Sequence, residues 1–454
     1  MLLVAMLMSL FCGTMYAFGS FETELKAKMN WSQTEIQMMG VAMHVGTYAM
    51  KPFCGALLDS AGAQISAAVA AGLSFTGYSV VSWCVMDGRD GSALPAFCFF
   101  LVGIASAQGY VTALSISITN FPIVARGKVV GAIASMFGVS ATVVSVLYSN
   151  ASMGLAGFFF LFACLMGGSN LLGCLVLRKI PHADDVDPEV ELQPFEELSM
   201  EESPVSSTTP TTPKVTLSSL PEGRERLTEL PLSLTDAVRE ICADPPYRLL
   251  YVTFGISCGA GLFVINNLGL MNQSLSGSPE EDKASVERLV ISLSICNMLG
   301  RLLAGQMMDA GFKGNVLLGL SSLAISASCL SSALIPEGSQ RLLLLTSIVT
   351  GLGYGGLWAV CPTMMAERYG VLNFGKTFGV VTTAPALTSF LANELIASHI
   401  YEASADEGTG ICLGQTCYMG SFLLMGLGGL ASALMTLWIR WDPQDRAKDD
   451  DCEG

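Results

Sequence analysis

Two nine-residue stretches of the chain place a cation, a glycine and an aspartate at the same spacing. They are KPFCGALLD, residues 51–59, and RLLAGQMMD, residues 301–309. Residues four apart lie on one side of a helix, so each stretch predicts a stripe of cation, Gly and Asp. Both stretches end apolar runs, where a cation is unfavourable unless it faces water or a partner. Lys51 and Arg301 are therefore candidates for binding an anion.

The composition places these stretches in a membrane protein. Of the 454 residues, 51% are hydrophobic and only 13% are charged, whereas a soluble protein has about 25% charged residues. The mean hydropathy is +0.54. Runs of roughly 20 apolar residues are long enough to span a bilayer as helices. The sequence predicts twelve of them, near 2–21, 34–57, 64–86, 95–119, 128–149, 153–177, 248–270, 286–308, 315–335, 341–366, 376–400 and 414–438.

Several function classes fit this sequence poorly. The net charge is −15, and no basic patch offers a surface for nucleic acid. The motif H-E-x-x-H is absent. G-x-S-x-G and G-x-x-x-x-G-K-[ST] match only GISCG (255–259) and GVLNFGKT (370–377), which lie in or beside predicted membrane spans and lack the strand–turn–helix context that these motifs need. Only three His residues occur. We therefore expect neither an enzyme nor a metal or cofactor site, and the predicted partners are a small solute and the lipid bilayer.

Changes in composition divide the chain into four parts. Residues 1–180 and 247–438 are apolar and hold six predicted helices each, and residues 439–454 form an acidic tail. Residues 181–246 begin with an acidic segment rich in Ser, Thr and Pro, which cannot bury enough apolar surface to order itself. The end of this predicted linker, SLTDAVREICADPP, favours a short helix capped at Ser233 or Thr235 and stopped before the prolines.

The two apolar parts are related to each other by sequence. RGKVVG (126–131) matches FGKTFG (374–379), and GIASAQG (103–109) matches GLGYGGL (351–357), both at an offset of 248. The opening pair of stretches has an offset of 250, and CGTMYAFGS in the first run matches CGAGLFVIN in the seventh. Matches in the same order indicate a parallel duplication of six helices. Two such halves around an axis along the membrane normal describe the major facilitator architecture, an all-α integral membrane fold.

The basic residues predict the orientation. Loops on the cytosolic side of a membrane carry an excess of Lys and Arg. Twelve spans put both termini on one side, and most of the 23 Lys and Arg fall on that side, among them Arg126, Lys128, Arg178, Lys179, Arg368, Lys376 and Arg440. Three N-x-S/T sequons, at Asn30, Asn150 and Asn272, fall on the other side. We expect cytosolic termini, in the plasma membrane or an endomembrane such as the vacuole.

The depth of the two cations follows from helix geometry. If Asp59 and Asp309 mark the cytosolic boundary, eight helical residues place the cations roughly 12 Å deeper, near the middle of a core about 30 Å thick. Transporters bind cargo at that depth, between their two halves. An alternative stays open, in which Arg301 pairs with Asp309 or with helix ends near the cytosolic face, acts as a gate and never contacts cargo. The Gly-Asp pairs, Gly55 with Asp59 and Gly305 with Asp309, favour gating, as do Arg126 and Gly127.

Five segments also carry a family resemblance. GALLDSAG (55–62) resembles the G-x-L-x-D-x-x-G loop of the major facilitator superfamily but lacks the usual basic residues after the Asp. Within that superfamily, residues 13–43, 119–131 and 296–309 resemble the nodulin-like branch, and IYEASADEGTGICLGQTCYMGSF (400–422) resembles the last outer loop of that branch. Its relatives include monocarboxylate porters and oxalate/formate exchangers, so the resemblance implies a transporter.

The resemblance assigns a role to Arg301. In monocarboxylate porters an Arg in the eighth helix, with an Asp four residues before it, couples proton and anion. Arg301 matches that Arg, but Asn297 stands where the Asp would be. Because Asn does not titrate, this departure puts proton coupling by the pair in doubt, although Asn297 can still help to bind cargo.

Other polar residues within the runs are weaker candidates. His44 precedes Lys51 by two helical turns and is a candidate proton relay; a histidine hydrogen-bonded between helices is the alternative. In this superfamily the first and seventh helices line the cavity, so Tyr16, Asn266 and Asn267 are candidates for cargo selection, with helix–helix hydrogen bonding as the alternative. Gln108, Trp358 and Glu394 are further candidates. Cys412 and Cys417, in the last outer loop, are expected to form a disulfide.

The sequence predicts a secondary transporter that moves a small organic anion, such as a monocarboxylate, by alternating access. It is expected to be a monomer, and protons are one candidate for the coupling ion. Two alternatives remain. The cargo could be a neutral or zwitterionic metabolite, with Lys51 and Arg301 acting as gates. The protein could instead be a membrane sensor or scaffold that acts through its acidic linker.

Overall fold

The structure is a computed structural model that describes residues 1–88, 91–150, 153–180, 231–276, 283–336 and 339–392, residues 396, 399, 400, 404 and 412, and residues 414–439. The described residues form helices and no strand. The first group is α1 (Leu2–Cys12), η1 (Gly13–Ser20), α2 (Glu22–Met29), α3 (Gln33–Tyr48), α4 (Lys51–Asp87), α5 (Ala93–Asn120), η2 (Ile123–Ala125), α6 (Arg126–Asn150) and α7 (Gly154–Val176). The second is α9 (Leu234–Ala243), α10 (Pro245–Ser276), α11 (Lys283–Asp309), α12 (Gly314–Ser332), α13 (Gln340–Tyr369), α14 (Phe374–Val381), α15 (Thr383–Phe390) and α17 (Thr416–Thr436).

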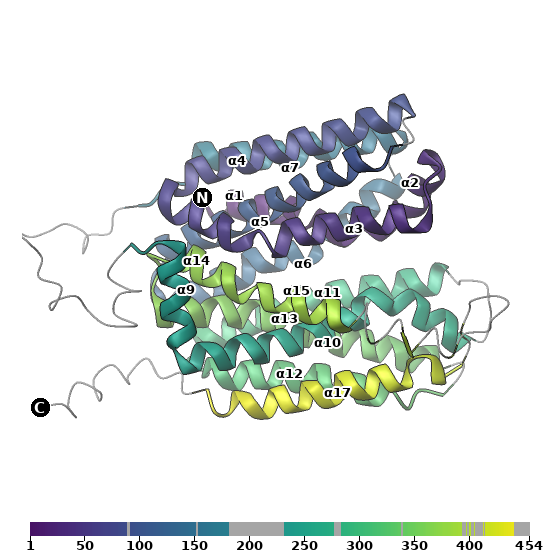
Figure 1. The fold of residues 1–454 in the computed structure, drawn as a ribbon. Coiled ribbons are helices and arrows are strands. Elements are labelled where there is room, and N and C mark those ends of the chain that lie inside the picture. Colours follow the sequence, from purple (N-terminus) through teal and green to yellow (C-terminus); the bar gives the residue numbers. More distant parts are fainter. Residues whose placement is uncertain are drawn as a thin grey trace, which may run out of the picture.

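The helices form two bundles that lie side by side (Figure 1). Helices α1 to α7 make the N-terminal half, and α10 to α17 make the C-terminal half. Helix α9 lies across one end of the C-terminal half, at the end of the molecule where the N-terminus also lies (Figure 1). We call this the α9 end. The two halves meet where α4 packs on α14 and where α6 packs on α11.

The described helices account for twelve membrane passes. Nine helical segments of the described chain are long and apolar enough to cross a membrane, and one of these, Thr34–Asp87, has 54 residues. A straight helix of that length would measure about 80 Å, far more than a hydrocarbon core of about 30 Å. The chain reverses at Gly62, whose φ of 81° only glycine adopts easily, so this segment makes two passes. The shorter apolar segment Leu2–Phe18 supplies another, and α14 with α15 supplies the last.

Three of the predicted spans are interrupted. The first, near 2–21, is α-helical only to Cys12 and continues as the 3₁₀ helix η1. The second, near 34–57, breaks at Ala49 and Met50, between α3 and α4. The eleventh, near 376–400, breaks at Thr382 between α14 and α15. Pro385 lies in the first turn of α15 and has no N–H to donate back across that break. The other predicted spans correspond to unbroken helices within a few residues, apart from the ends.

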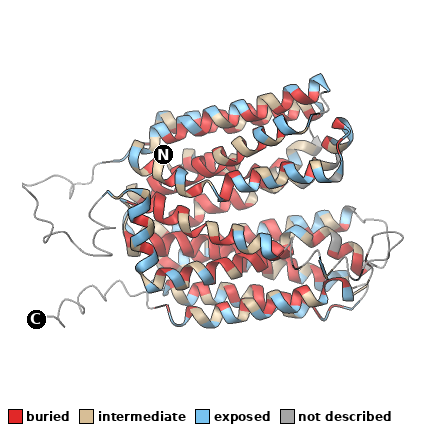
Figure 2. Ribbon diagram, in the orientation of Figure 1, coloured by how far each residue is buried: buried red, intermediate tan, exposed pale blue. Residues whose placement is uncertain are grey.

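Burial follows the lipid environment. Figure 2 shows buried residues concentrated between the helices and exposed residues on the outer faces of both halves. Large apolar side chains are among the exposed ones, for example Phe53, Leu175 and Leu427, which are 57–63% exposed. Lipid tails are as apolar as these side chains, so a membrane protein can expose them at no loss. Small residues let the helices approach closely instead, as at Gly46 and Gly103, which face each other between α3 and α5.

The end opposite α9 carries the sequons and the last loop. Asn30 is exposed and ends α2 in the left-handed conformation, with φ of 53°. Asn272 is only 1% exposed and accepts a hydrogen bond from Ser285 at 3.2 Å, so it joins α10 to α11 and offers no surface for a glycan. The structure contains the disulfide expected between Cys412 and Cys417. Ser274 donates to the carbonyl of Cys412 at 2.8 Å, which fixes this loop to α10.

Candidate functional site

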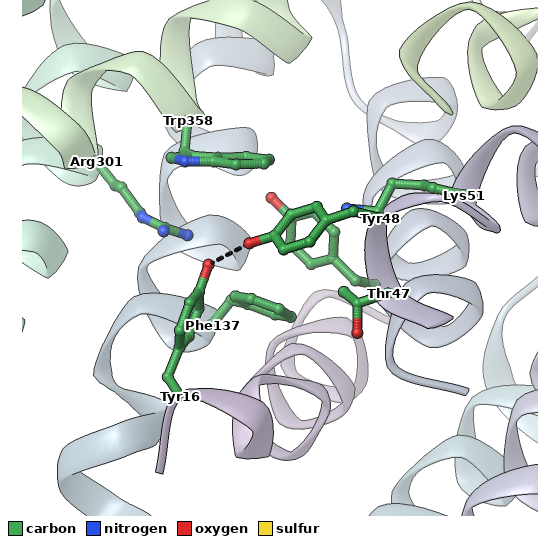
Figure 3. Close-up of a pocket in the computed structure, with 8 residues that line it drawn as sticks. Tyr16, Thr47, Tyr48, Lys51, Phe137, Arg301 and Trp358 are labelled. Carbon is green, nitrogen blue, oxygen red and sulfur yellow. Dashed lines mark hydrogen bonds between the residues drawn. The ribbon is translucent and has the colours of Figure 1, made fainter. Parts of the chain in front are cut away.

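Lys51 and Arg301 line the same small cavity between the two halves. Lys51 is the first residue of α4 and Arg301 lies within α11, and their exposed fractions are 2% and 1%. The other lining residues are Tyr16, Thr47, Tyr48, Tyr110, Phe137 and Trp358. Figure 3 shows Arg301 and Trp358 entering from the C-terminal half and the labelled tyrosines from the N-terminal half. The repeat in the sequence thus brings its two cations to one place.

Arg301 is held in position by two acceptors. Its Nε donates to Oδ1 of Asn297 at 3.0 Å, one turn earlier on α11. Its Nη1 donates to the backbone carbonyl of Ala134 on α6, in the other half, at 2.5 Å. A guanidinium fixed at Nε and at one terminal nitrogen has its plane and direction set. Asn297 therefore orients the charged guanidinium of Arg301 with a neutral amide oxygen.

Lys51 is surrounded by aromatic rings. Its Nζ lies 5.2 Å from the ring centre of Tyr48, 5.6 Å from that of Tyr110 and 5.5 Å from that of Trp358. An ammonium this close to the face of a ring is stabilised by the ring quadrupole, by about 0.5–2 kcal/mol per contact. Because Trp358 belongs to the C-terminal half, this aromatic cage also connects the halves. Unlike a hydrogen-bonded guanidinium, the ammonium can turn on its flexible stem.

Neither cation has an acidic partner within the described part of the chain. The ion pairs found there join Asp236 to Arg239, Asp244 to Arg368, and Asp59 to Lys376. Glu394 lies outside the described residues. Two positive charges at the centre of a membrane protein without a facing carboxylate leave a place for an anion.

The cavity also presents hydrogen-bond donors that the protein does not use. Trp358 Nε1 and the Tyr110 hydroxyl are buried, and neither has a hydrogen-bond partner among the described residues. The Tyr16 and Tyr48 hydroxyls bond to each other at 3.0 Å (Figure 3). Buried donors are normally satisfied, so unused ones around a cavity indicate a ligand or water that accepts from them. The cavity measures about 10 Å³, room for about one water molecule, so it must widen to admit a solute.

The two aspartates of the opening stretches close two contacts at the α9 end. Asp59 accepts hydrogen bonds from the backbone N–H groups of Gly375 at 3.1 Å and Lys376 at 2.9 Å, at the start of α14. We call this contact the first latch. Asp309 accepts from Gly127 at 2.7 Å and Lys128 at 2.8 Å, at the start of α6, which is the second latch. A carboxylate is favourable at a helix N-terminus, where free N–H groups and the helix dipole both attract it.

The predicted gating glycines lie inside these latches. A Cβ on Gly55 would come within 1.9 Å of the Gly375 carbonyl oxygen, and one on Gly305 within 2.2 Å of the Gly127 oxygen. Only glycine allows backbones to approach this closely. Arg126 lies beside the second latch, where its Nε donates to the carbonyl of Ile118 at 3.2 Å. In this structure Arg301 does not pair with Asp309, because each has the other partners just described.

Several sequence candidates lie outside the cavity lining. The exposed ring of His44 stacks on Tyr48, with 6.2 Å between ring centres and an angle of 8°, so it touches the site only through that tyrosine. Asn266 is exposed, and Asn267 donates to the carbonyl of Phe263 on its own helix at 2.9 Å. Gln108 donates to the carbonyl of Cys54 at 3.1 Å. Asn266, Asn267 and Gln108 are not among the residues that line the cavity.

The sequence reasoning did not identify Thr47, Tyr48, Tyr110 and Phe137 as part of the site. The sequence contains a signal for two of them, Tyr110 and Tyr48. The offset of 248 that aligns GIASAQG with GLGYGGL also aligns Tyr110 with Trp358, and these are two of the three rings around Lys51. Tyr48 precedes Lys51 by three residues, a spacing that places both on one side of the predicted helical span 34–57.

Known proteins of similar sequence and fold cover nearly the whole chain. The family model described as Major Facilitator Superfamily matches residues 2–392. The "Probable transporter MCH1" of Yarrowia lipolytica is 22% identical, over 93% of this chain and 88% of its own length. The protein of the same name in Saccharomyces cerevisiae is also 22% identical, over 92% and 87%.

Solved structures agree in fold at lower identity. A proton:xylose symporter, XylE, has 15% identity and a TM-score of 0.63 over 97% of this chain and 95% of its own. The Escherichia coli fucose:proton symporter FucP has 11% identity and a TM-score of 0.61 over 97% and 98%. These findings identify a multi-pass membrane transporter rather than an enzyme. The chain belongs to the Major Facilitator Superfamily.

Proposed function

We propose that the protein is a secondary transporter that moves a small organic anion, of the monocarboxylate class, by alternating access. The observation that carries this proposal is the convergence of Lys51 and Arg301 on one cavity, from the two halves, without a facing carboxylate among the described residues. An anionic cargo would supply the missing charge. It would also contact both halves at once, which is how cargo can couple binding to their movement.

The two cations would divide the work of recognition. Arg301, oriented by Asn297 and the Ala134 carbonyl, presents its remaining N–H groups in a fixed plane suited to a carboxylate. Lys51 can leave its aromatic cage and turn toward the bound anion. The unused donors of Trp358 and Tyr110 would donate to further oxygen atoms of the cargo or to the water that accompanies it.

The latches support alternating access. Both lie at the α9 end, which we assign to the cytosol because the basic residues favour cytosolic termini. With both latches closed, cargo reaches the site from the outer side. Widening of the cavity and release to the cytosol then require both aspartates to leave their helix N-termini. The proposal does not specify which ion gradient drives this movement. Asn297 cannot carry a proton, and His44, stacked on Tyr48, is the titratable group to test for proton coupling.

We place the protein in the nodulin-like branch on the strength of the four segments that resemble it. The relatives named probable transporters are compatible with that placement and do not name a cargo. We further propose that residues 181–246 link the two halves in the cytosol, and that one chain suffices for transport because the cavity is built within it. The membrane is the plasma membrane or an endomembrane such as the vacuole.

The test is uptake of labelled solutes into liposomes that contain the purified protein. The panel holds monocarboxylates, dicarboxylates, amino acids and neutral sugars, each with and without an inward proton gradient. We expect uptake of monocarboxylates, and a rise with the gradient if protons are coupled. Uptake of sugars or amino acids alone would support the neutral or zwitterionic alternative. No uptake by folded protein would support the sensor or scaffold alternative.

Variants connect the result to the site. Arg301→Gln should lower anion uptake about 100-fold, and Arg301→Lys, which keeps the charge but loses the planar fork, should recover part of it. Arg239→Gln is the matched control, since Arg239 is 81% exposed on α9 and its one ion pair among the described residues is with Asp236. Unchanged anion uptake in Arg301→Gln would show that Arg301 does not contact the cargo.

A further inference from the structure

The first latch is connected to the end of the linker by a short series of hydrogen bonds. Lys376 Nζ donates to Asp59 at 3.2 Å and to the Asn373 side-chain oxygen at 3.4 Å. The same oxygen of Asn373 accepts the backbone N–H of Leu232 at 3.1 Å, two residues before α9 begins. Asn373 is the N-cap residue of α14 and is fully buried. One side-chain oxygen thus joins the linker end to the helix terminus that receives Asp59.

Helix α9 is fastened to the C-terminal half at both of its ends. At its start, Leu232 is bound to Asn373, and Ser233 caps the helix by accepting the N–H of Asp236. At its end, Asp244 forms a bidentate ion pair with Arg368, at 2.8 and 2.9 Å, and accepts from the Tyr369 hydroxyl. Between them, Ala237 and Ile241 are buried one turn apart. The helix packs on α14 and α10 and also touches α4, in the other half.

The far end of α9 reaches the latch through a second route. Tyr369 packs edge-on against Tyr247, with 5.9 Å between ring centres. The Tyr247 hydroxyl donates to the carbonyl of Thr377, the residue after Lys376. The start of α14 is therefore held by Asn373 on one side and by Tyr247 on the other, and both contacts depend on where α9 lies.

We infer that residues 232–244 form a strap that positions the N-terminus of α14 for Asp59, and that Asn373 and Asp244 are its positioning residues. The strap holds the first latch closed and so sets how readily the α9 end of the transporter opens. The second latch has no such attachment among the described residues, since Asp309 meets only the start of α6. The inference concerns the gate and holds for any cargo, so it can fail or succeed independently of the proposed function.

Hydrogen exchange of the full-length protein in lipid nanodiscs tests the strap without a substrate. The N–H groups of Gly375 and Lys376 are bonded to Asp59, so their exchange reports opening of the first latch. Asn373→Ala and Asp244→Asn should each raise exchange of a peptide covering residues 371–380 by about tenfold, the factor for a net loss of about 1.4 kcal/mol. Exchange in α12, inside the C-terminal half, should not change.

Matched variants separate the strap from general damage. Asn373→Asp keeps an acceptor for both Leu232 and Lys376 and should retain slow exchange. Arg239→Gln removes an exposed charge from the same helix and should behave like the unmodified protein. A rise in Asp244→Asn that is equal in α14 and α12 would overturn the inference, because α9 would then support the whole fold rather than the latch. Unchanged α14 exchange in both Asn373→Ala and Asp244→Asn would overturn it as well.

Discussion

The two latches use the same atoms of the same residue type but differ in their surroundings. In each, an Asp at the end of one half accepts two backbone N–H groups at a helix start in the other half. Among the described residues, only the aspartate of the first latch forms a side-chain ion pair, since Lys376 Nζ contacts Asp59 at 3.2 Å, with the two side chains 6% and 3% exposed. Lys128, which the repeat aligns with Lys376, is exposed to solvent. The first latch is a dry ion pair, and the second is a wetter hydrogen-bonded cap.

The two cations differ in the same way. Arg301 is held by two hydrogen bonds, whereas Lys51 is held by rings alone. A duplicated sequence therefore supplies one fixed and one mobile cation, and one strong and one weak latch. We expect the weaker latch to open first, at a smaller free-energy cost, and the stronger latch then to determine whether the halves separate.

The largest difference between the latches is expected from removing each aspartate charge. Asp59→Asn leaves the buried Lys376 without its counter-ion, and breaking a buried pair destabilises by about 3–5 kcal/mol. Asp309→Asn removes one charge from two hydrogen bonds beside solvent and should cost about 1–2 kcal/mol. Hydrogen exchange at residues 375–376 and 127–128 measures both openings. An equal or larger effect of Asp309→Asn would contradict the ranking of the latches.

The loss of anion uptake should be larger when the more firmly held cation, Arg301, is removed than when Lys51 is removed. Arg301→Gln removes the oriented guanidinium and should lower anion uptake about 100-fold, a loss of about 3 kcal/mol typical of a charged hydrogen bond. Lys51→Gln removes a cation that must first leave its cage, and should lower uptake about tenfold. Initial rates across a concentration series in proteoliposomes give both values. A larger loss for Lys51→Gln would make Lys51 the principal anion contact.

Replacing the glycine of either latch by alanine should open the two latches to a similar extent. Gly55→Ala and Gly305→Ala each place a methyl group into a backbone carbonyl, at 1.9 and 2.2 Å, so in both the helices must separate. Overpacking of this kind costs about 1–3 kcal/mol, and exchange should rise at both helix starts. Gly72→Ala is the control, because a Cβ there meets nothing within 4 Å. A response from Gly55→Ala alone would mean that only the first latch closes tightly in the membrane.

The sequence was sufficient for the architecture and for part of the site. The offset near 250 predicted two related halves, and helix geometry placed Lys51 and Arg301 at one depth, which agrees with the cavity that they share. The partners of Asp59 and Asp309 could not be predicted. They are backbone N–H groups in the other half, and every residue except proline has one, so nothing in the sequence marks which of them will be bonded.

Side-chain direction limited the rest. Asn266 and Asn267 are polar residues in the seventh span, but one is exposed and the other bonds to its own helix, because the rotation of α10 about its axis is fixed by packing against distant segments. The rings of Tyr110 and Phe137 resembled ordinary apolar core residues. Their role in the site follows from their position beside Lys51, a residue of another helix, and the chain brings them together only when it folds.

The smallest expected effect concerns the unused donors, one from each half. Trp358→Phe and Tyr110→Phe each keep an aromatic ring near Lys51 and delete one buried N–H or O–H that has no described partner. Because no hydrogen bond within the protein is lost, the thermal stability should stay the same or rise slightly. If the cargo accepts from these donors, each variant should raise the half-saturating anion concentration about threefold, and the double variant about tenfold.

The same pair of variants sharpens the comparison of the halves. Trp358 belongs to the half that carries the fixed Arg301, and Tyr110 to the half that carries the mobile Lys51. If Arg301 anchors the carboxylate, the rest of the anion lies closest to the ring beside that anchor, and Trp358→Phe should have the larger effect. Equal uptake curves for all four proteins would show that these donors face water instead of cargo, and recognition would then depend on the two cations alone.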